Sequence, residues 1–350
     1  RPLDLSRHSA CNTVGGIMVD ISTLEYKVVA FDEGGKKHDI TDFIENFGWE
    51  ENDHELAVRL SFTARNDIVS KSRLSSTIKP NCLILAYAKS GKKPFEEVVR
   101  GKVVTWSRVN RNSGYTFKCT AYDDLYCLQK SQDDFFFQSG ISTKSRISKV
   151  LGQWGISLGK YEGPNASHGK KKYQAMYISD IVLAILDDGV KKGGSKCIIR
   201  QEKGQVQIVK RGGNKDVYVF ETDNTTALTH SLSTEDMVTR VKIMGKEKKG
   251  GKEKVIATLN GDTKYGIRQR IYKRGHDEKL SDAKSAAQAI LDENGRLKNE
   301  AKVQSPDVPY IRKGDLVCMR AQQIKGDFYV LSIQHDAETR SMTMDIKRKK

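Results

Sequence analysis

Alternating apolar and polar positions mark the first third of the chain as β-structure. Every second residue of 56–65 is apolar, which is the pattern of a strand with one buried face. An apolar run follows at 82–87. Two further alternating segments flank the polar, glycine-containing turn at 110–114, which is typical of a β-hairpin. Short strands joined by turns predict a small antiparallel barrel or sandwich.

The last third repeats this order of elements. Its alternation around Val241 is followed by an apolar run at 316–319 and by a second closing hairpin. Apolar and glycine positions coincide when the thirds are aligned, with Arg240 on Arg59, 316–319 on 83–86, Gly326 on Gly101, Phe328 on Val103, Met342 on Phe117, Met344 on Cys119 and Ile346 on Ala121. Three matches in one order predict an internal duplication.

The middle of the chain changes to helical spacing. Apolar residues recur every three or four positions in 142–154 and in 177–192, and these runs end at Gly155 and Gly193. A short hairpin around Gly204 completes a small α+β domain. The second repeat also holds extra chain, which predicts a strand at 267–272 and a helix at 281–294 with Ser281 as its N-cap.

These patterns predict an α+β, mainly β fold. Two related small antiparallel β-barrel domains flank a small α+β middle domain, and the second barrel carries a helical insertion. The predicted limits are 18–128, 129–224 and 225–350, with the insertion at about 258–305. We expect residues 1–17 to be an added or disordered leader and Met18 to be the native start.

The composition is that of a folded, basic protein. Of its 350 residues 37% are hydrophobic, and 60 Lys and Arg against 44 Asp and Glu give a net charge of +16. Both signs of charge are abundant, so a disordered tail is excluded. Most of the excess lies after residue 235, much of it in 246–254 and 347–350. Such runs are typical of a solvated surface, and the alternative is contact with nucleic acid or an acidic partner.

Motifs for catalysis or cofactor binding do not stand out. HExxH, GxSxG and GxGxxG are missing, and the lysine-rich segment 245–252 lacks the Gly-Lys-Ser/Thr ending of a phosphate loop. The six cysteines are scattered without a CxxC pair, which favours reduced thiols. No apolar run is long enough to cross a membrane, because the longest is 181–186. The sequence therefore predicts no catalytic, cofactor-binding or metal site.

An ordered set of short motifs gives the chain its resemblance to a known family. The set is Asp262, Tyr265 and Gly266, then the helix at 281–294, Gly314 and Asp315, and finally Gly326, Phe328, Tyr329, Val330, His335, Met342 and Met344. In this order they resemble the baseplate hub protein of PBSX-type phage-like elements, a contractile-tail hub similar to tail protein D. The resemblance covers about 20–347 and includes Gly48 and Trp49 before the first alternating strand.

The resemblance implies a structural role without an enzyme activity or a cofactor. It implies a homotrimer that joins a sixfold tail tube to a threefold spike and lines the lumen of the tube. Its implied partners are the tube protein, the spike protein, other baseplate proteins and the tape-measure protein, with DNA only as passing cargo and no membrane. The implied location is the baseplate of a virion or phage-tail-like particle assembled in the bacterial cytoplasm. The motif residues would then maintain the fold.

Two other functions remain open from the sequence. The basic C-terminal third is compatible with a nucleic-acid-binding protein. A tail-associated cell-wall hydrolase is disfavoured, because no extra domain with a catalytic constellation is left over.

Overall fold

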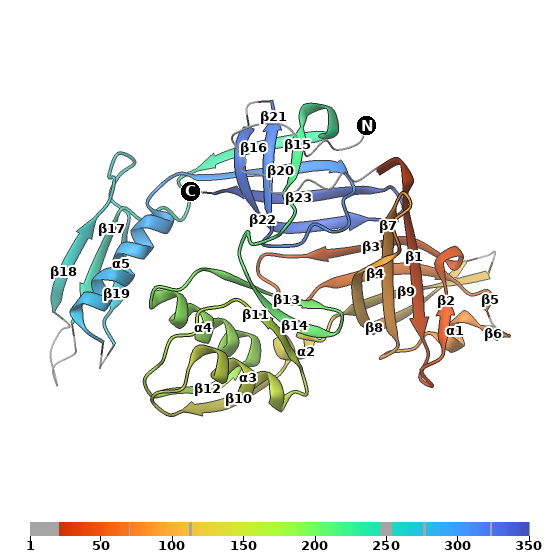
Figure 1. Cartoon of the computed structure of the whole chain (residues 1–350), viewed down its shortest axis with the longest axis horizontal. Coiled ribbons are helices and arrows are strands. Elements are labelled where there is room, and N and C mark those ends of the chain that lie inside the picture. The colour runs from red at the N-terminus through yellow and green to blue at the C-terminus, as the bar shows by residue number, and fades with distance from the viewer. Residues whose placement is uncertain are drawn as a thin grey trace.

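One sheet of 13 strands is the largest feature of the computed structural model (Figure 1), which describes residues 21–69, 71–111, 114–245, 254–275, 278–322 and 324–349. The N-terminal half of this sheet consists of β1 (Leu24–Phe31), β2 (Lys37–Asp39), β3 (Ile44–Glu51), β4 (Arg59–Arg65), β7 (Leu83–Ser90), β8 (Glu96–Arg111) and β9 (Gly114–Tyr122). Beside it lie the short hairpin β5 (Ile68–Val69) and β6 (Ser72–Arg73), and the helix α1 (Leu74–Thr77). Their shared core includes Leu60, Phe62 and Phe117.

The C-terminal half of the sheet repeats the strand order of the N-terminal half. It consists of β15 (Tyr218–Glu221), β16 (Ala227–Ser233), β20 (Lys298–Pro306), β21 (Leu316–Ala321), β22 (Ile324–Asp336) and β23 (Ser341–Arg348). The order β16-β20-β23-β22-β21-β15 corresponds position by position to β3-β4-β9-β8-β7-β1. One difference is direction, because β15 runs parallel to β21 whereas β1 runs antiparallel to β7. The internal duplication is thus visible in the topology.

The register supports this correspondence, agrees with the predicted alignment of Ile346 with Ala121, and corrects other parts of that alignment. Both closing hairpins carry a register shift at the same place, after Val103 opposite Ala121 and after Val330 opposite Ile346. Val103 therefore corresponds to Val330, two positions from the predicted Phe328. The alignment of Arg240 with Arg59 is wrong, because β20 takes the place of β4 beside the closing hairpin.

The two halves form one open sheet, and the prediction of two separate closed barrels is corrected. No sheet of the described residues closes on itself, and β3 pairs with β22 of the other half. The length of β22 explains this: one edge pairs with β21 along Ile324–Tyr329, and Ile333–Asp336 is left for β3. The mainly β composition is confirmed.

The middle segment packs below the large sheet in Figure 1 and contains the predicted helices. Its elements are α2 (Leu125–Lys130), β10 (Gln132–Phe137), α3 (Thr143–Gln153), β11 (Leu158–Tyr161), β12 (Lys171–Tyr177), α4 (Ile178–Lys191), β13 (Cys197–Glu202) and β14 (Gln205–Lys210). Strands β10 and β12 form a pair, and β11, β14 and β13 form a small sheet. Ile147 and Ile181 place the apolar stripes of α3 and α4 in one core. Both predicted helices and the hairpin around Gly204 are confirmed.

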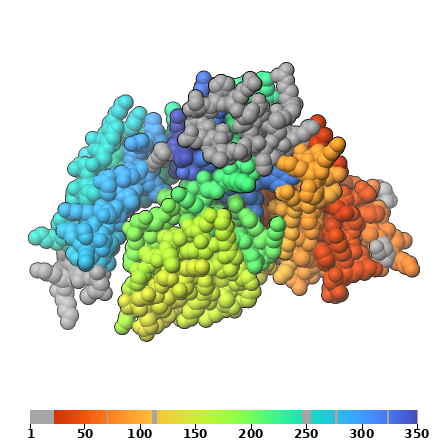
Figure 2. Space-filling model, viewed as in Figure 1, coloured from red at the N-terminus to blue at the C-terminus, as the bar shows by residue number. Residues whose placement is uncertain are grey.

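A separate unit, here called the side module, lies at one end of the molecule (Figures 1 and 2). It consists of β17 (Arg240–Met244), β18 (Val255–Asn260), β19 (Gln269–Lys273) and α5 (Leu280–Asn294), with the strands in the order β18-β17-β19. It starts earlier in the chain than the predicted insertion at 258–305, and β20 already belongs to the large sheet. The limits of the domains stay a prediction. Ser281 is not the N-cap of α5, because the helix begins one residue before it and Lys279 occupies the cap position.

Several sequence predictions lie outside the described residues. These are the leader at 1–17, the start at Met18 and most of the basic segment 246–254. Within the described ranges, no helix combines the length and the apolar character needed to span a membrane.

Candidate functional site at the junction of the sheet halves

The two sheet halves meet at a backbone contact that needs a glycine. In the β3–β22 pairing, Trp49 lies opposite His335 and Gly48 lies opposite Asp336. A Cβ atom on Gly48 would stand 2.5 Å from the carbonyl oxygen of His335, closer than real Cβ atoms approach any heavy atom. The Trp49 ring stacks on the His335 ring with a centroid distance of 4.5 Å. This contact joins the halves through both backbone and side chains.

His335 is held at this contact by a buried hydrogen-bond network. Its Nδ1 lies 2.6 Å from Asp307 Oδ1, and its Nε2 lies 3.1 Å from the carbonyl oxygen of Ile311. A backbone carbonyl only accepts, so the Nε2 atom carries a proton. The Tyr26 hydroxyl donates to the other oxygen of Asp307, and burial together with this carboxylate raises the pKa of Tyr26. Strands β1 and β22 are thereby linked through the loop after β20.

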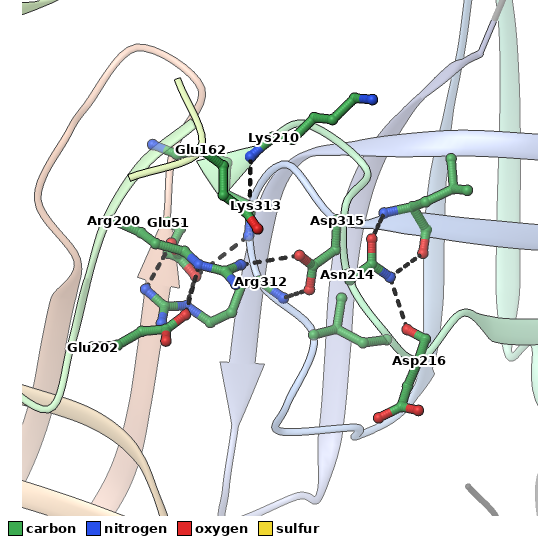
Figure 3. Close-up of polar contacts among 12 residues, drawn as sticks. Glu51, Glu162, Arg200, Glu202, Lys210, Asn214, Asp216, Arg312, Lys313 and Asp315 are labelled. Carbon is green, nitrogen blue, oxygen red and sulfur yellow. Dashed lines mark hydrogen bonds and ion pairs between the residues drawn. The ribbon is translucent and has the colours of Figure 1, made fainter. Parts of the chain in front are cut away.

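The same loop carries a buried ion pair to β3. The Arg312 guanidinium contacts both oxygens of Glu51, with Nη2 3.2 Å from Oε2 (Figure 3). The side chain of Glu51 is 2% exposed and that of Arg312 is 12% exposed. Burial alone would raise the pKa of Glu51, but the charge and hydrogen bonds of Arg312, together with the charges of Lys313 and Arg200, outweigh burial and lower it. The pair is therefore ionised inside the protein, where each charge depends on the other.

Neighbouring residues of this loop reach the other units. Lys313 Nζ donates to the carbonyl oxygens of Asn52 and Glu55 after β3, and burial lowers the pKa of Lys313. Asp315 Oδ1 lies 3.0 Å from Arg200 Nη1, so the loop also holds β13 of the middle segment. Burial raises the pKa of Asp315 despite this partner.

Gly314 allows the loop to pack tightly on the middle segment. Its φ of +86° lies in the left-handed region, and an added Cβ would stand 2.2 Å from Ile198 Cγ1. The carbonyl oxygen of Gly314 accepts from the Gly212 amide at 2.8 Å. Beside it, the Asn214 side chain accepts from the Leu316 amide at 2.7 Å and donates to the Leu316 carbonyl at 2.9 Å (Figure 3). The chain leaving β14 is thus fixed to the start of β21.

A cleft of about 170 Å³ opens beside this cluster, and Asp123 and Arg312 line it. Asp123 Oδ1 accepts from the Leu125 amide at 3.1 Å, whereas Oδ2 is buried without a hydrogen-bond partner among the described residues. Burial raises the pKa of Asp123 to about 8. Arg100, Arg200 and Arg312 also line the cleft, and each pairs with a carboxylate of the chain. The arrangement is suited to holding three units in a fixed orientation.

The structure distributes the ten predicted motif residues over three places. Gly314, Asp315 and His335 lie at the junction. Phe328, Val330 and Met344 are buried in the core of the C-terminal sheet half, and Gly326 lies in β22 with a φ of +117°. Asp262, Tyr265 and Gly266 lie in the side module, where the Gly266 carbonyl accepts from Thr239 Oγ1 at 2.9 Å. The motif is therefore not a single site.

Sequence reasoning missed most of the junction. Glu51, Tyr26, Asp307, Arg312 and Arg200 gave no motif, because their partners lie far away in the chain. One signal was available for Glu51: the alternation of β3 places it on the same buried face as Phe47 and Trp49. A carboxylate at a buried position of a strand predicts a buried cationic partner.

Replacing Glu51 by glutamine tests the buried pair. Glu51→Gln leaves the Arg312 guanidinium buried without its counter-charge, so we expect a loss of about 3–5 kcal/mol in the free energy of unfolding. Glu202→Gln is the matched control, since Glu202 pairs with Arg200 but is 42% exposed, and its loss should be about 1 kcal/mol or less. Urea denaturation measures both. Equal losses would contradict the assignment.

The raised pKa of Asp123 predicts a pH dependence of stability. The folded chain holds a proton up to about pH 8, whereas the unfolded carboxyl loses it near pH 4, so this residue lowers stability as the pH rises between those values. Asp123→Asn removes this contribution. Relative to the wild type, the free energy of unfolding of the variant should therefore increase from pH 5 to 8, by up to about 1.4 kcal/mol per pH unit, and its melting temperature should increase accordingly. If the melting temperatures of the two proteins change with pH in the same way over this range, the raised pKa of Asp123 is refuted.

Solved structures share this fold at low sequence identity. The 43 kDa tail protein of prophage MuSo2 from Shewanella oneidensis has a TM-score of 0.69 and 14% identity, covering 93% of this chain and 98% of that chain. The tail protein from Neisseria meningitidis MC58 has a TM-score of 0.67 and 12% identity, covering 93% and 97%. The chain therefore has the fold of these phage tail proteins.

Sequence comparison identifies the family. The uncharacterized protein YqbQ of Bacillus subtilis strain 168 is 23% identical over 276 residues, which cover 73% of this chain and 78% of that protein. The YqbQ-like family model matches residues 49–349. This match begins within β3, after β1 and β2, and extends through the closing hairpin of the C-terminal sheet half. The chain belongs to the YqbQ-like family.

Proposed function

We propose that the chain is a structural protein of a phage tail or phage-tail-like particle, acting as its baseplate hub. The observation that carries the proposal is the repeated six-strand order within one continuous sheet. Each chain contributes two similar sheet units in a fixed relation. The junction of Glu51, Arg312 and His335 keeps that relation constant. The fold shared with phage tail proteins supports this reading.

The duplication suits a symmetry adaptor. Three chains related by a threefold axis would present six similar units around that axis. Such a ring can match a sixfold tail tube on one side and a threefold spike on the other. In this proposal the ring lines the tube lumen, and its partners are the tube, spike and other baseplate proteins, with the tape-measure protein inside. A PBSX-type hub is the specific form of the proposal.

Open sheet edges provide places for neighbouring chains. The order of the large sheet ends at β2 and β16, and β15 pairs only with β21 among the described residues. Unpaired strand edges in soluble proteins are commonly covered or protected. Leu232 on β16 is 58% exposed, which marks this edge as partly apolar. Neighbouring subunits of a ring would cover these edges.

The predicted domains and motif residues each have a role in this proposal. The predicted domains at 18–128 and 225–350 would be the two ring-forming units, with β15 added to the second because it pairs with β21, and the rest of 129–224 would lie at the periphery. The motif residues of the core and the junction would act by maintaining the fold, since their contacts are within the chain. We assign them no catalytic role.

The mass of the particle that the chain forms in solution tests this proposal. Light scattering should give about 118 kDa, three times the chain mass of 39.3 kDa, at sufficient concentration. Leu232→Asp should reduce the trimer fraction, because it places a charge on the β16 edge. Leu183→Asp on α4, where Leu183 is 44% exposed, is the matched control and should not. Monomer alone over the whole concentration range would contradict the hub, whereas a trimer that tolerates Leu232→Asp would place the interface elsewhere.

A further inference from the structure

Helix α5 covers one face of the small sheet of the side module, and no element of the described residues covers the other face. Val241 and Ile243 of β17 point to α5, where they form a core with Ala283 and Ala287. Because side chains alternate along a strand, Lys242 and its alternate neighbours on β17 lie on the other face. Helix α5 also contacts α4, so it lies between the sheet and the rest of the molecule (Figure 1). The other face is directed away from the body.

This uncovered face combines apolar and basic side chains. We call it the open face and define it by Arg240, Lys242, Met244, Val255, Thr258 and Ile271, which share it by strand register. Ile271 is 55% exposed and Val255 is 42% exposed. Lys242 lies between Thr258 on one side and Ile271 on the other. The open face is therefore an apolar surface with a positive charge at its centre.

The strands of the side module contain no aspartate or glutamate. Their sequences are Arg-Val-Lys-Ile-Met, Val-Ile-Ala-Thr-Leu-Asn and Gln-Arg-Ile-Tyr-Lys. The positive charges of the open face consequently have no carboxylate on their own sheet. Arg240 donates instead to the amide oxygen of Asn260 at 2.9 Å. Six of the fourteen markedly exposed large apolar side chains of the described residues belong to this module, so the exposure is concentrated rather than scattered.

We propose that the open face is a docking site for an acidic protein surface, one that presents carboxylates beside apolar side chains. Carboxylates would pair with Lys242 and Arg240, and the apolar groups would cover Ile271 and Val255. Charge complementarity of this kind fixes orientation and speeds association. A nucleic acid fits less well, because single strands are held on sheets by stacking on aromatic rings. The only aromatic side chain of these strands, Tyr272, packs toward α5.

The size of the open face sets the expected affinity. Three strands of five or six residues cover about 14 Å by 17 Å, or roughly 240 Å². A stable protein interface buries about 800 Å² on each partner, so a single open face binds weakly. Several copies held in one assembly would bind strongly through multivalency. The proposal does not depend on the hub assembly, because the face belongs to one chain and is uncovered there.

Binding of synthetic acidic polymers to the full chain tests the proposal. The probes are a random copolymer of glutamate and tyrosine at four to one, polyglutamate without tyrosine, and a 20-residue thymidine oligonucleotide. We expect the copolymer to bind more tightly than polyglutamate, with an affinity that falls as salt is raised. Lys242→Glu should weaken copolymer binding about fivefold. Ile271→Ser should reduce the preference for the tyrosine-containing copolymer about threefold.

The matched control is a charge reversal on α5, the helix that lies on the opposite side of the sheet from the open face. Lys284→Glu lies on the exposed surface of α5 and changes the net charge by the same amount, so it should alter copolymer binding by less than about twofold. Thermal melts followed by circular dichroism establish that each variant is folded. If Lys242→Glu disturbs the sheet, Lys242→Gln is used in its place. Equal weakening by both reversals would overturn the proposal in favour of general charge attraction. Oligonucleotide binding that exceeds copolymer binding and is lost in Lys242→Glu would overturn it in favour of a nucleic acid.

Discussion

The buried contact between the Glu51 carboxylate and the Arg312 guanidinium constrains the rest of this structure. It joins the end of β3 in one sheet half to the loop between β20 and β21 in the other. Removing two charges from water costs several kcal/mol for each ion, so a packed apolar pair would give comparable or greater stability. What the ion pair adds is orientation, because a guanidinium and a carboxylate meet well in few geometries. We infer that the role of this ion pair is to fix the angle between the two sheet halves.

The surrounding contacts extend this constraint to the whole molecule. Arg200 connects the middle segment to Asp315 in the same loop, and Asp307 holds His335 against Trp49 at the strand pairing. The loop therefore touches three units with a few adjacent residues. A monomer that contributes two similar units to a ring must hold them at one angle, since small angular errors would accumulate around the ring. The side module has no part in this junction, which leaves its open face available for another partner.

The sequence predicted local elements better than the connections between them. Helices α3 and α4 were predicted because their apolar stripes have strong helical spacing. The repeat was detected, but β17 was mistaken for the counterpart of β4. Both strands alternate cleanly, and alternation does not reveal which sheet a strand joins. The true counterpart, β20, alternates only through Ala301, Val303 and Ser305, a much weaker apolar signal. The closed barrels were predicted for a similar reason, because pairing of β3 with β22 depends on the length of β22 and on Gly48.

The junction was hidden from sequence reasoning because its contacts join residues far apart in the chain: Glu51 and Arg312 are separated by 261 positions, and even Asp307 and His335 by 28. The central proposal that depends on this junction is that each chain supplies two equivalent units to a ring. Single-particle electron microscopy of the assembled chain tests this claim most directly. We predict three chains around a channel, with six similar sheet units at nearly equal angles about one axis. An assembly in which the two halves of each chain occupy unrelated positions would contradict it.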